Sequence, residues 1–249
     1  MSYTEHNRQT IDGWVAEGWE WSIPLSHEEY VSAVHGDYRL LLTPTKTVPP
    51  HWLGDLKGKR VLALASGGGQ QGPILIAQGA IVTVFDLSPA QLAREKEVAS
   101  REGYQIELIQ GDMTQPLPFP DNHFDMIIHP VSNCYIEQVE PVWRECARIL
   151  TPGGYLLAGL DNGMNFVVDE DEERLAYALP HNPLKDEAQR QRALKDGAGY
   201  QFSHSIEEQI TGQLRAGLEL LDLYEDTNGI GRLHELKIPT FWATLSRKP

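Results

Sequence analysis

Three glycines, Gly67, Gly69 and Gly72, have the spacing G-x-G-x-x-G directly after an apolar run. Glycine carries no Cβ atom, so a ligand can approach the backbone there unusually closely. Asp86 follows at the end of the next apolar run, where its carboxylate can accept hydrogen bonds from the ribose hydroxyls of an adenosine ligand. The glycine spacing alone is a weak signal, and these residues fit a nicotinamide dinucleotide as well as other adenosine ligands.

The segment GDM at residues 111–113 helps to separate these ligands. Asp112 can accept a hydrogen bond from an adenine amino group, and the flexible thioether of Met113 can pack on the face of the ring. Beyond it the chain continues in a long excursion and two strands, whereas a nicotinamide enzyme normally has a second mononucleotide-binding half. The pattern therefore favours an adenosine ligand other than a dinucleotide.

Alternating strands and helices must position these residues. Apolar and β-branched runs predict the strands, and one intervening helix is well marked, because Ser88 can cap its start and Gly103 can end it. This order is typical of right-handed β-α-β units in a doubly wound α/β sheet. Strands are expected at 60–65, 80–88, 105–113, 124–130, 155–160, 218–226 and 238–248, and helices at 72–80, 88–103, 141–150 and 205–217.

Two segments depart from this alternation. Residues 1–58 are expected to form an N-terminal extension or lid, irregular or with short helices, because prolines at 44, 49 and 50 oppose a long helix. Residues 161–203 are expected to form an inserted helical cap, in which the acidic run 169–173 would lie on a solvated helix face.

Five sequence blocks, in order over residues 59 to 160, resemble the class I S-adenosylmethionine-dependent methyltransferases, and they are most similar to the small-molecule "type 11" domains. Each block is modest in specificity, but their order and strand positions together are a strong signal. The blocks are VLALASGGG (61–69), TVFDLSPAQL (83–92), IELIQGDM (106–113), FPDNHFDMIIHPVSN (119–133) and VWRECARILTPGGYLLAG (142–159).

The resemblance implies S-adenosyl-L-methionine as the cofactor of a domain at 59–249, with a seven-stranded, mostly parallel sheet and an antiparallel last strand. Relatives usually carry an acidic residue and a glycine where this chain has Ala63 and Ala65. Either another group supplies the contact of the missing carboxylate, or the affinity for the cofactor is reduced, or the protein is a degenerate relative. The expected cofactor-binding residues are Ala65, Ser66, Gly67, Gly68, Gly69, Asp86, Leu87, Asp112, Met113, Pro130 and Val131.

Methyl transfer is an in-line displacement at a carbon that the sulfonium already activates, so alignment and exclusion of water supply most of the catalysis. A base helps when the acceptor must lose a proton, and His129 is the candidate, although it could instead be buried at the strand end. Trp21, Tyr30, Asn133 and Tyr135 are candidate acceptor residues. The N-terminal tryptophans could alternatively seal the extension against the core.

The net charge of −14 opposes binding to nucleic acid or to an anionic membrane surface. The two cysteines, Cys134 and Cys146, form neither a disulfide framework nor a metal-binding pattern, which suits a reducing cytoplasm. No metal site is expected, because the histidines lack ligand spacing. The aromatic N-terminal segment leaves a homodimer open.

The leading hypothesis is therefore a cytoplasmic methyltransferase that acts on a small molecule. Ala63 and Ala65 keep open a non-catalytic protein that binds S-adenosylmethionine or S-adenosylhomocysteine. The glycine spacing keeps open an NAD-dependent oxidoreductase.

Overall fold

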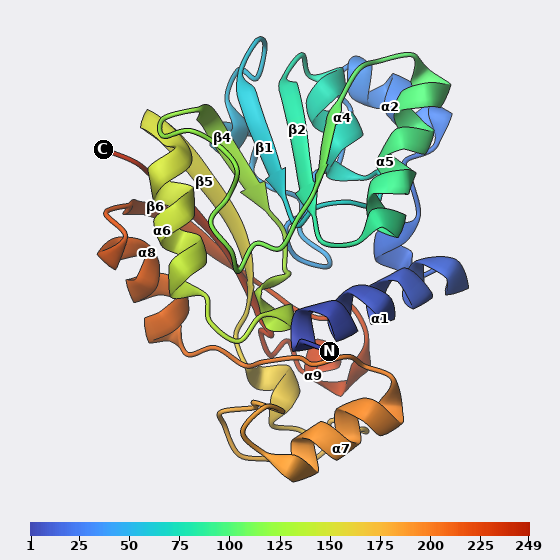
Figure 1. Cartoon of the computed structure of the whole chain (residues 1–249), viewed down its shortest axis with the longest axis vertical. Helices are drawn as coiled ribbons and strands as arrows, with labels where there is room; N and C mark the ends of the chain where they lie inside the picture. The colour runs from blue at the N-terminus through green and yellow to red at the C-terminus, as the bar shows by residue number, and fades with distance from the viewer.

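Seven strands form one sheet, in the order β3-β2-β1-β4-β5-β7-β6, in the computed structural model, which describes residues 1–249 (Figure 1). The first five strands pair in parallel, and β7 pairs antiparallel with both β5 and β6. The predicted fold class, a mostly parallel doubly wound sheet with an antiparallel last strand, is confirmed. The strands are β1 (Arg60–Leu64), β2 (Ile81–Asp86), β3 (Glu107–Gln110), β4 (Phe124–His129), β5 (Leu150–Asp161), β6 (Glu219–Asp226) and β7 (Phe241–Arg247).

The central strand β1 divides its side chains between two cores, because successive residues of a strand point to opposite faces. Val61 and Ala63 join the core beneath α2, α4 and α5, whereas Leu62 and Leu64 join the core beneath α6. Figure 1 shows these helices on the two faces of the sheet. The helices are α2 (His27–Val34), α3 (Pro50–Leu53), α4 (Gln71–Ala77), α5 (Pro89–Glu102), α6 (Glu140–Ile149), α8 (Gly212–Arg215) and α9 (Gly231–Glu235).

Two of the predicted helices show how local sequence sets their ends. In α5, the Ser88 hydroxyl accepts a hydrogen bond from the Gln91 amide, and Gly103 ends the helix with φ +75°. The helix expected at 205–217 has the predicted capping box between Ser205 and Glu208. It differs in its first turn, where Glu207–Thr211 form a π-helix before α8 begins.

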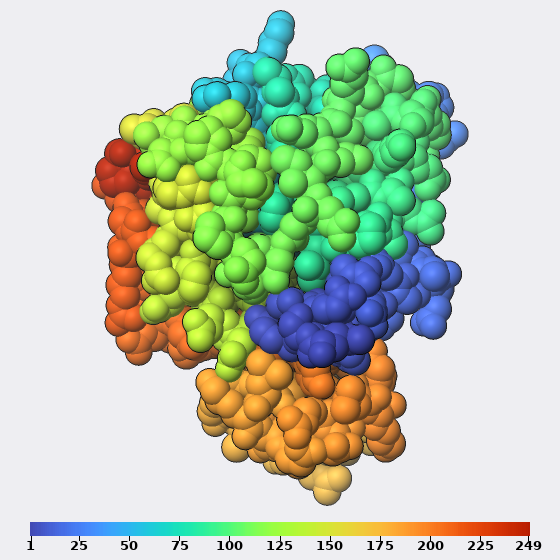
Figure 2. Space-filling model, in the orientation of Figure 1, coloured from blue at the N-terminus to red at the C-terminus, as the bar shows by residue number.

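The N-terminal segment is more helical than expected. Helix α1 (Tyr3–Glu17) has 15 residues, with Ser2 as its N-cap and Gly18 as its left-handed C-cap. The prolines at 44–50 restrict only the segment that they occupy, which is far from this helix. Helix α1 contacts α5. Figure 2 shows α1, in dark blue, between the green part of the molecule and the orange residues of the 161–203 segment.

Residues 161–203, the expected cap, contain one α-helix, α7 (Glu187–Asp196), in a helix-compatible sequence, and a short 3-10 helix at Met164–Phe166. The acidic run is not helical, and that prediction is wrong. Residues 169–173 form turns in which the Asp169 carboxylate accepts hydrogen bonds from the amides of Glu173 and Arg174. Short acidic side chains that bond to nearby backbone amides favour turns over helices.

Across the whole chain, none of the helices has both the length and the apolar character that crossing a bilayer would require.

Candidate functional site

A cavity of about 290 Å³ lies at the carboxyl ends of the parallel strands. Ligands of open α/β sheets bind at this edge, near the point where the strand order reverses. Residues after β1, β2, β3 and β4 form its floor, and the N-terminal segment contributes Trp19, Trp21 and residues 41–44 to its wall. The site is thus enclosed by segments from both ends of the chain.

The loop after β1 supplies one side of the cavity through Ala65, Ser66 and Gly67. The Gly67 amide donates to the Asp86 carboxylate over 2.8 Å. A Cβ atom at Gly67 would lie 2.6 Å from Cβ of Gln91, so no larger residue fits there. Ala65 adopts a left-handed φ of +48°, which explains why methyl-donor loops of this kind usually have glycine at that position.

Gly68 and Gly69 do not line the cavity, contrary to the sequence-based assignment. A Cβ atom at Gly68 would lie 2.5 Å from the carbonyl oxygen of Trp21. The Gly69 carbonyl accepts from the Leu25 amide, and its own amide donates to the buried carboxyl of Glu95. These two glycines give space to the protein's own N-terminal segment and to α5.

Asp86 closes the end of β2 and lines the cavity while only 8% exposed. Its two oxygens accept from the amides of Gly67 and Ser88, over 2.8 and 2.9 Å. Burial raises the pKa of this carboxyl to about 6. Each carboxylate oxygen keeps a further lone pair, so Asp86 can still accept from a ligand hydroxyl.

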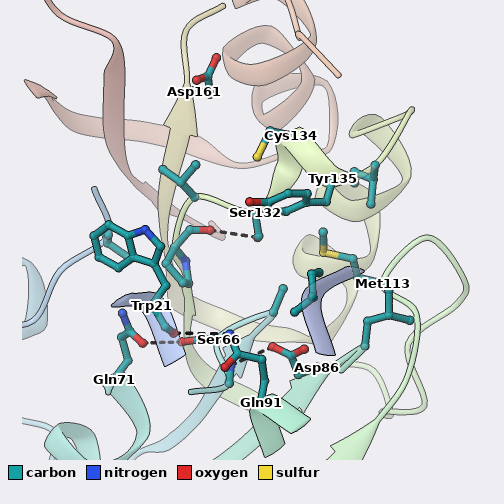
Figure 3. A pocket seen from close by; sticks show the side chains of 18 of the residues that line it. Trp21, Ser66, Gln71, Asp86, Gln91, Met113, Ser132, Cys134, Tyr135 and Asp161 are labelled. Carbon is teal, nitrogen blue, oxygen red and sulfur yellow. Dashed lines mark hydrogen bonds between the residues drawn. The ribbon is translucent and has the colours of Figure 1, made fainter. Parts of the chain in front are cut away.

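The predicted residues after β2 and β3 also line the cavity. Leu87 lies beside Asp86, and Asp112 and Met113 follow β3. Figure 3 shows Asp86 and Met113 on the same side of the cavity. Next to them, Gln91 lines the same wall, and its buried Oε1 atom has no hydrogen-bond partner within the protein. A polar nucleoside fits this combination, because it offers donors to Asp86 and Gln91 and an apolar ring face to Met113.

His129 is not at the mouth of the cavity, and the structure therefore corrects its placement. The ring is fully buried, with Nδ1 2.9 Å from the Leu64 carbonyl oxygen and Nε2 2.8 Å from the Asn133 side-chain oxygen. Burial lowers its pKa. Both nitrogens have partners inside the protein, whereas a general base needs one nitrogen free to reach a substrate.

The four candidate acceptor residues separate into two pairs. Trp21 and Tyr135 line the cavity, as do Pro130 and Val131 after β4. Tyr30 does not, because it stacks on Tyr104 with ring centroids 5.6 Å apart.

Asn133, the fourth candidate, is also misplaced by the sequence-based assignment. Its side-chain amide donates to Gln209 over 3.1 Å, and its oxygen faces His129. The buried chain of His129, Asn133 and Gln209 joins β4 to the π-helical turn and belongs to the protein interior.

Asp161, at the end of β5, is a cavity residue that the sequence analysis missed. It is 7% exposed, and its two oxygens accept from the Gly163 amide over 2.6 Å and from the Asn165 side chain over 3.0 Å. Burial raises its pKa to about 6. Its position at a strand's carboxyl end was the available signal. Cys134, Asn165, Phe166 and Phe241 also line this end and were not assigned to the site.

All charged side chains that line the cavity are acidic: Asp86, Asp112 and Asp161. The wall contains no lysine, arginine or histidine. Nowhere in the chain do three His, Cys, Asp or Glu side chains meet as a metal ion would require. The cavity therefore presents a negative potential to its ligands.

The sequence comparisons with known proteins match this chain to methyltransferases. Residues 62–158 match a family model described as a methyltransferase domain. The chain is 37% identical over 250 residues to the uncharacterized methyltransferase YbaJ of Bacillus subtilis, covering 98% of this chain and 97% of that protein. It is 27% identical over 191 residues to the ubiquinone/menaquinone biosynthesis C-methyltransferase UbiE of Azotobacter vinelandii, covering 73% of this chain and 74% of that protein.

Solved structures are similar in fold. An S-adenosylmethionine-dependent methyltransferase from Mesorhizobium loti superimposes with a TM-score of 0.61 at 19% identity, over 79% of this chain and 94% of that one. The [4+2]-cyclase SpnF superimposes with a TM-score of 0.62 at 17% identity, over 98% of this chain and 95% of that one. At such identities the likeness concerns the fold alone.

Proposed function

This chain belongs to the class I S-adenosylmethionine-dependent methyltransferases, and on that premise we propose that it methylates a small molecule bound beside the cofactor in the strand-end cavity. The observation that carries the proposal is the enclosure of this cavity. Its wall includes Thr4 and Trp21 from the N-terminal segment, together with Phe166 and Gln201 from the cap and its exit. An acceptor must reach the methyl group between these segments, which favours a small molecule over the surface of a folded macromolecule.

S-adenosyl-L-methionine, when bound, supplies a methyl group that its sulfonium has already activated for transfer. Asp86 is suited to accept from the ribose hydroxyls, and Asp112 with Met113 and Leu87 is suited to hold the adenine ring. Ala65, Ser66 and Gly67 offer backbone at the glycine loop, and Pro130 and Val131 border the same space. These assignments make the β1–β4 side of the cavity its cofactor end.

The opposite side is then the acceptor end, where Tyr135 and Asp161 lie (Figure 3). Trp21 borders the cavity beside the glycine loop, with its carbonyl against Gly68. Residues 1–58 act as a lid, and 161–203 act as a cap beside it. Together they exclude water and restrict the approach of the acceptor. Holding two reactants in line in this way lowers a barrier by about 7–11 kcal/mol.

The proposal is tested by giving the enzyme S-adenosylmethionine with a deuterated methyl group and a cell extract separated into small-molecule, protein and nucleic-acid fractions. We expect mass spectrometry to find the label in the small-molecule fraction. A control reaction with the Asp86→Ala variant, at a limiting concentration of the donor, should give much less label, because that variant lacks the ribose acceptor and binds the donor more weakly. Label in the protein or nucleic-acid fraction alone would refute the proposal.

A further inference from the structure

At the acceptor end of the cavity, the carboxylate of Asp161 has no basic side chain opposite it. The proposed function uses Asp86 and Asp112 at the cofactor end but gives no role to Asp161. Figure 3 shows Asp161 at the far end from Asp86, beyond Cys134 and Tyr135. A buried carboxylate is costly to keep without a compensating charge, and no basic residue lies along this wall.

Asp161 is held in a fixed orientation by the protein. The Gly163 amide and the Asn165 side chain each donate to one of its oxygens, and both oxygens retain a second lone pair. The neighbouring titratable groups cannot take a proton from a substrate near neutral pH, because burial raises the pKa values of both the Cys134 thiol and the Tyr135 phenol. Asp161 is therefore the proton acceptor of this end.

A second hollow adjoins the acceptor end and shares Trp19, Tyr135 and Gln201 with the cavity. The rings of Trp14 and Trp19 lie 5.1 Å apart, and those of Trp14 and Tyr135 lie 6.0 Å apart. The charged residues of this hollow are again acidic, namely Glu17 and Asp196. Aromatic faces together with carboxylates attract organic cations.

We propose that the methyl acceptor is a small amine, which enters as an ammonium ion past the aromatic hollow and is deprotonated by Asp161. This inference rests on the proposed function and specifies its substrate class. The shared negative charge of both hollows favours a cation over a carboxylate or phosphate acceptor. The apolar side chains of Phe166 and Phe241 would contact its carbon skeleton.

The step balances in atoms and charge. The ammonium group gives one proton to the Asp161 carboxylate, and the free nitrogen lone pair then forms the N–C bond. The S–C bond breaks, and its electron pair stays on sulfur. The product is a methylated ammonium ion, which carries the charge formerly on the sulfonium, and Asp161 returns its proton to water when the product leaves.

The test uses the same extract and deuterated methyl donor. We expect each labelled small-molecule product to be retained by a cation exchanger at neutral pH and to carry the label on nitrogen by fragmentation in the mass spectrometer. The variant Asp161→Asn has the same shape and should lower turnover about 100- to 10,000-fold, the range for loss of a general base. Its affinity for S-adenosylhomocysteine, measured by calorimetry, should not change.

Asp125→Asn is the matched control, because Asp125 accepts from the Arg60 amide at the opposite edge of the sheet. It should keep full activity. Trp14→Leu should raise KM for the labelled amine roughly 2- to 30-fold at unchanged kcat, which is the range of a cation–π contact.

Three results would overturn the inference: label on oxygen, sulfur or carbon, product in the neutral or anionic fraction, or full turnover by Asp161→Asn. The absence of any labelled small molecule would instead refute the proposed function itself.

Discussion

The two ends of the cavity are built from the chain in different ways. The proposed cofactor end uses successive strand ends between residues 65 and 113, whereas the proposed acceptor end gathers Tyr135, Asp161 and Phe241 from distant segments. The first arrangement follows from β-α-β order alone. The second depends on how the N-terminal segment and the cap pack over the sheet. From this difference we infer that cofactor binding depends on segments close together in the sequence, and acceptor binding on how distant segments pack.

The largest change in the free energy of unfolding should come from substitution of Glu95, whose carboxyl contacts the backbone of the glycine loop after β1. This residue is fully buried, its Oε1 accepts from the Gly69 amide over 2.8 Å, and its Oε2 has no partner. Burial raises its pKa from the usual 4.5 to about 8. The folded protein therefore keeps a proton that the unfolded chain releases, and stability falls as pH rises from about 4.5 to about 8.

Glu95→Gln should remove this pH dependence and stabilise the protein at pH 8 by up to about 4 kcal/mol, with little effect below pH 4.5. Urea unfolding across this pH range measures it. The control is Glu97→Gln, an exposed position on the same helix. Equal slopes for the two variants would show that Glu95 is already ionised in the folded state.

Asp86→Ala tests whether the two ends act separately. Loss of this carboxylate should weaken S-adenosylhomocysteine binding by about 1–3 kcal/mol, or roughly 5- to 150-fold in Kd. Calorimetry without an acceptor isolates this effect. Asp161→Asn, measured alongside it, should leave the same Kd unchanged. If both variants weaken binding equally, the division of the cavity into two ends is wrong.

The acceptor end should depend on Asn7, which joins α1 to two other segments. Its side chain is buried, donates to the carbonyls of Tyr135 and Tyr200 over 2.9 and 2.8 Å, and accepts from the Tyr200 amide over 2.7 Å. Asn7→Ala should destabilise the protein by about 1–2 kcal/mol and raise KM for the acceptor, because buried backbone groups lose their partners.

S-adenosylhomocysteine affinity should be retained in this variant. Gln9→Ala, exposed on the same helix, is its control and should change neither quantity. An unchanged KM in Asn7→Ala would argue that α1 does not position the acceptor.

The smallest effect concerns the left-handed backbone at Ala65. Glycine adopts φ +48° without the steric cost of a Cβ atom, so Ala65→Gly should stabilise the protein by about 0.5–1 kcal/mol. Ala63→Gly, in the extended backbone of β1, should do the opposite. Thermal and urea unfolding measure both. Destabilisation by Ala65→Gly would contradict strain at this turn.

The sequence placed Gly67, Asp86 and Met113 at the ends of strands that their own segments define, and the structure brings all three to the cavity wall. The sequence could not predict the orientation of the His129 ring and placed it at the mouth of the cavity. In the structure the ring faces the interior, where Nδ1 contacts the carbonyl oxygen of Leu64 on the adjacent strand β1. Asp161 follows the same strand-end rule as Asp86. It was missed because residues from 161 onward were assigned to the inserted cap, whereas β5 continues through Asp161 by pairing with Phe241.

At Gly68 and Gly69, the sequence could not predict which group approaches the backbone. Their bare backbone correctly indicated a close approach, but the approaching group is the protein's own Trp21 carbonyl and Leu25 amide. Composition at these positions cannot distinguish a ligand from a distant part of the same chain.

The Asn7 contacts also determine when the acceptor end can fold during synthesis of the chain. Helix α1 is synthesised before the strands of the sheet, yet Tyr200, the partner of Asn7, follows 193 positions later. Contacts between such distant residues form slowly, because a long loop must close before they are gained. The early strands of the sheet can pair before Tyr200 is made. Until then, Asn7 of α1 lacks its hydrogen-bond partners in that residue. The acceptor end is therefore completed only when most of the chain has emerged.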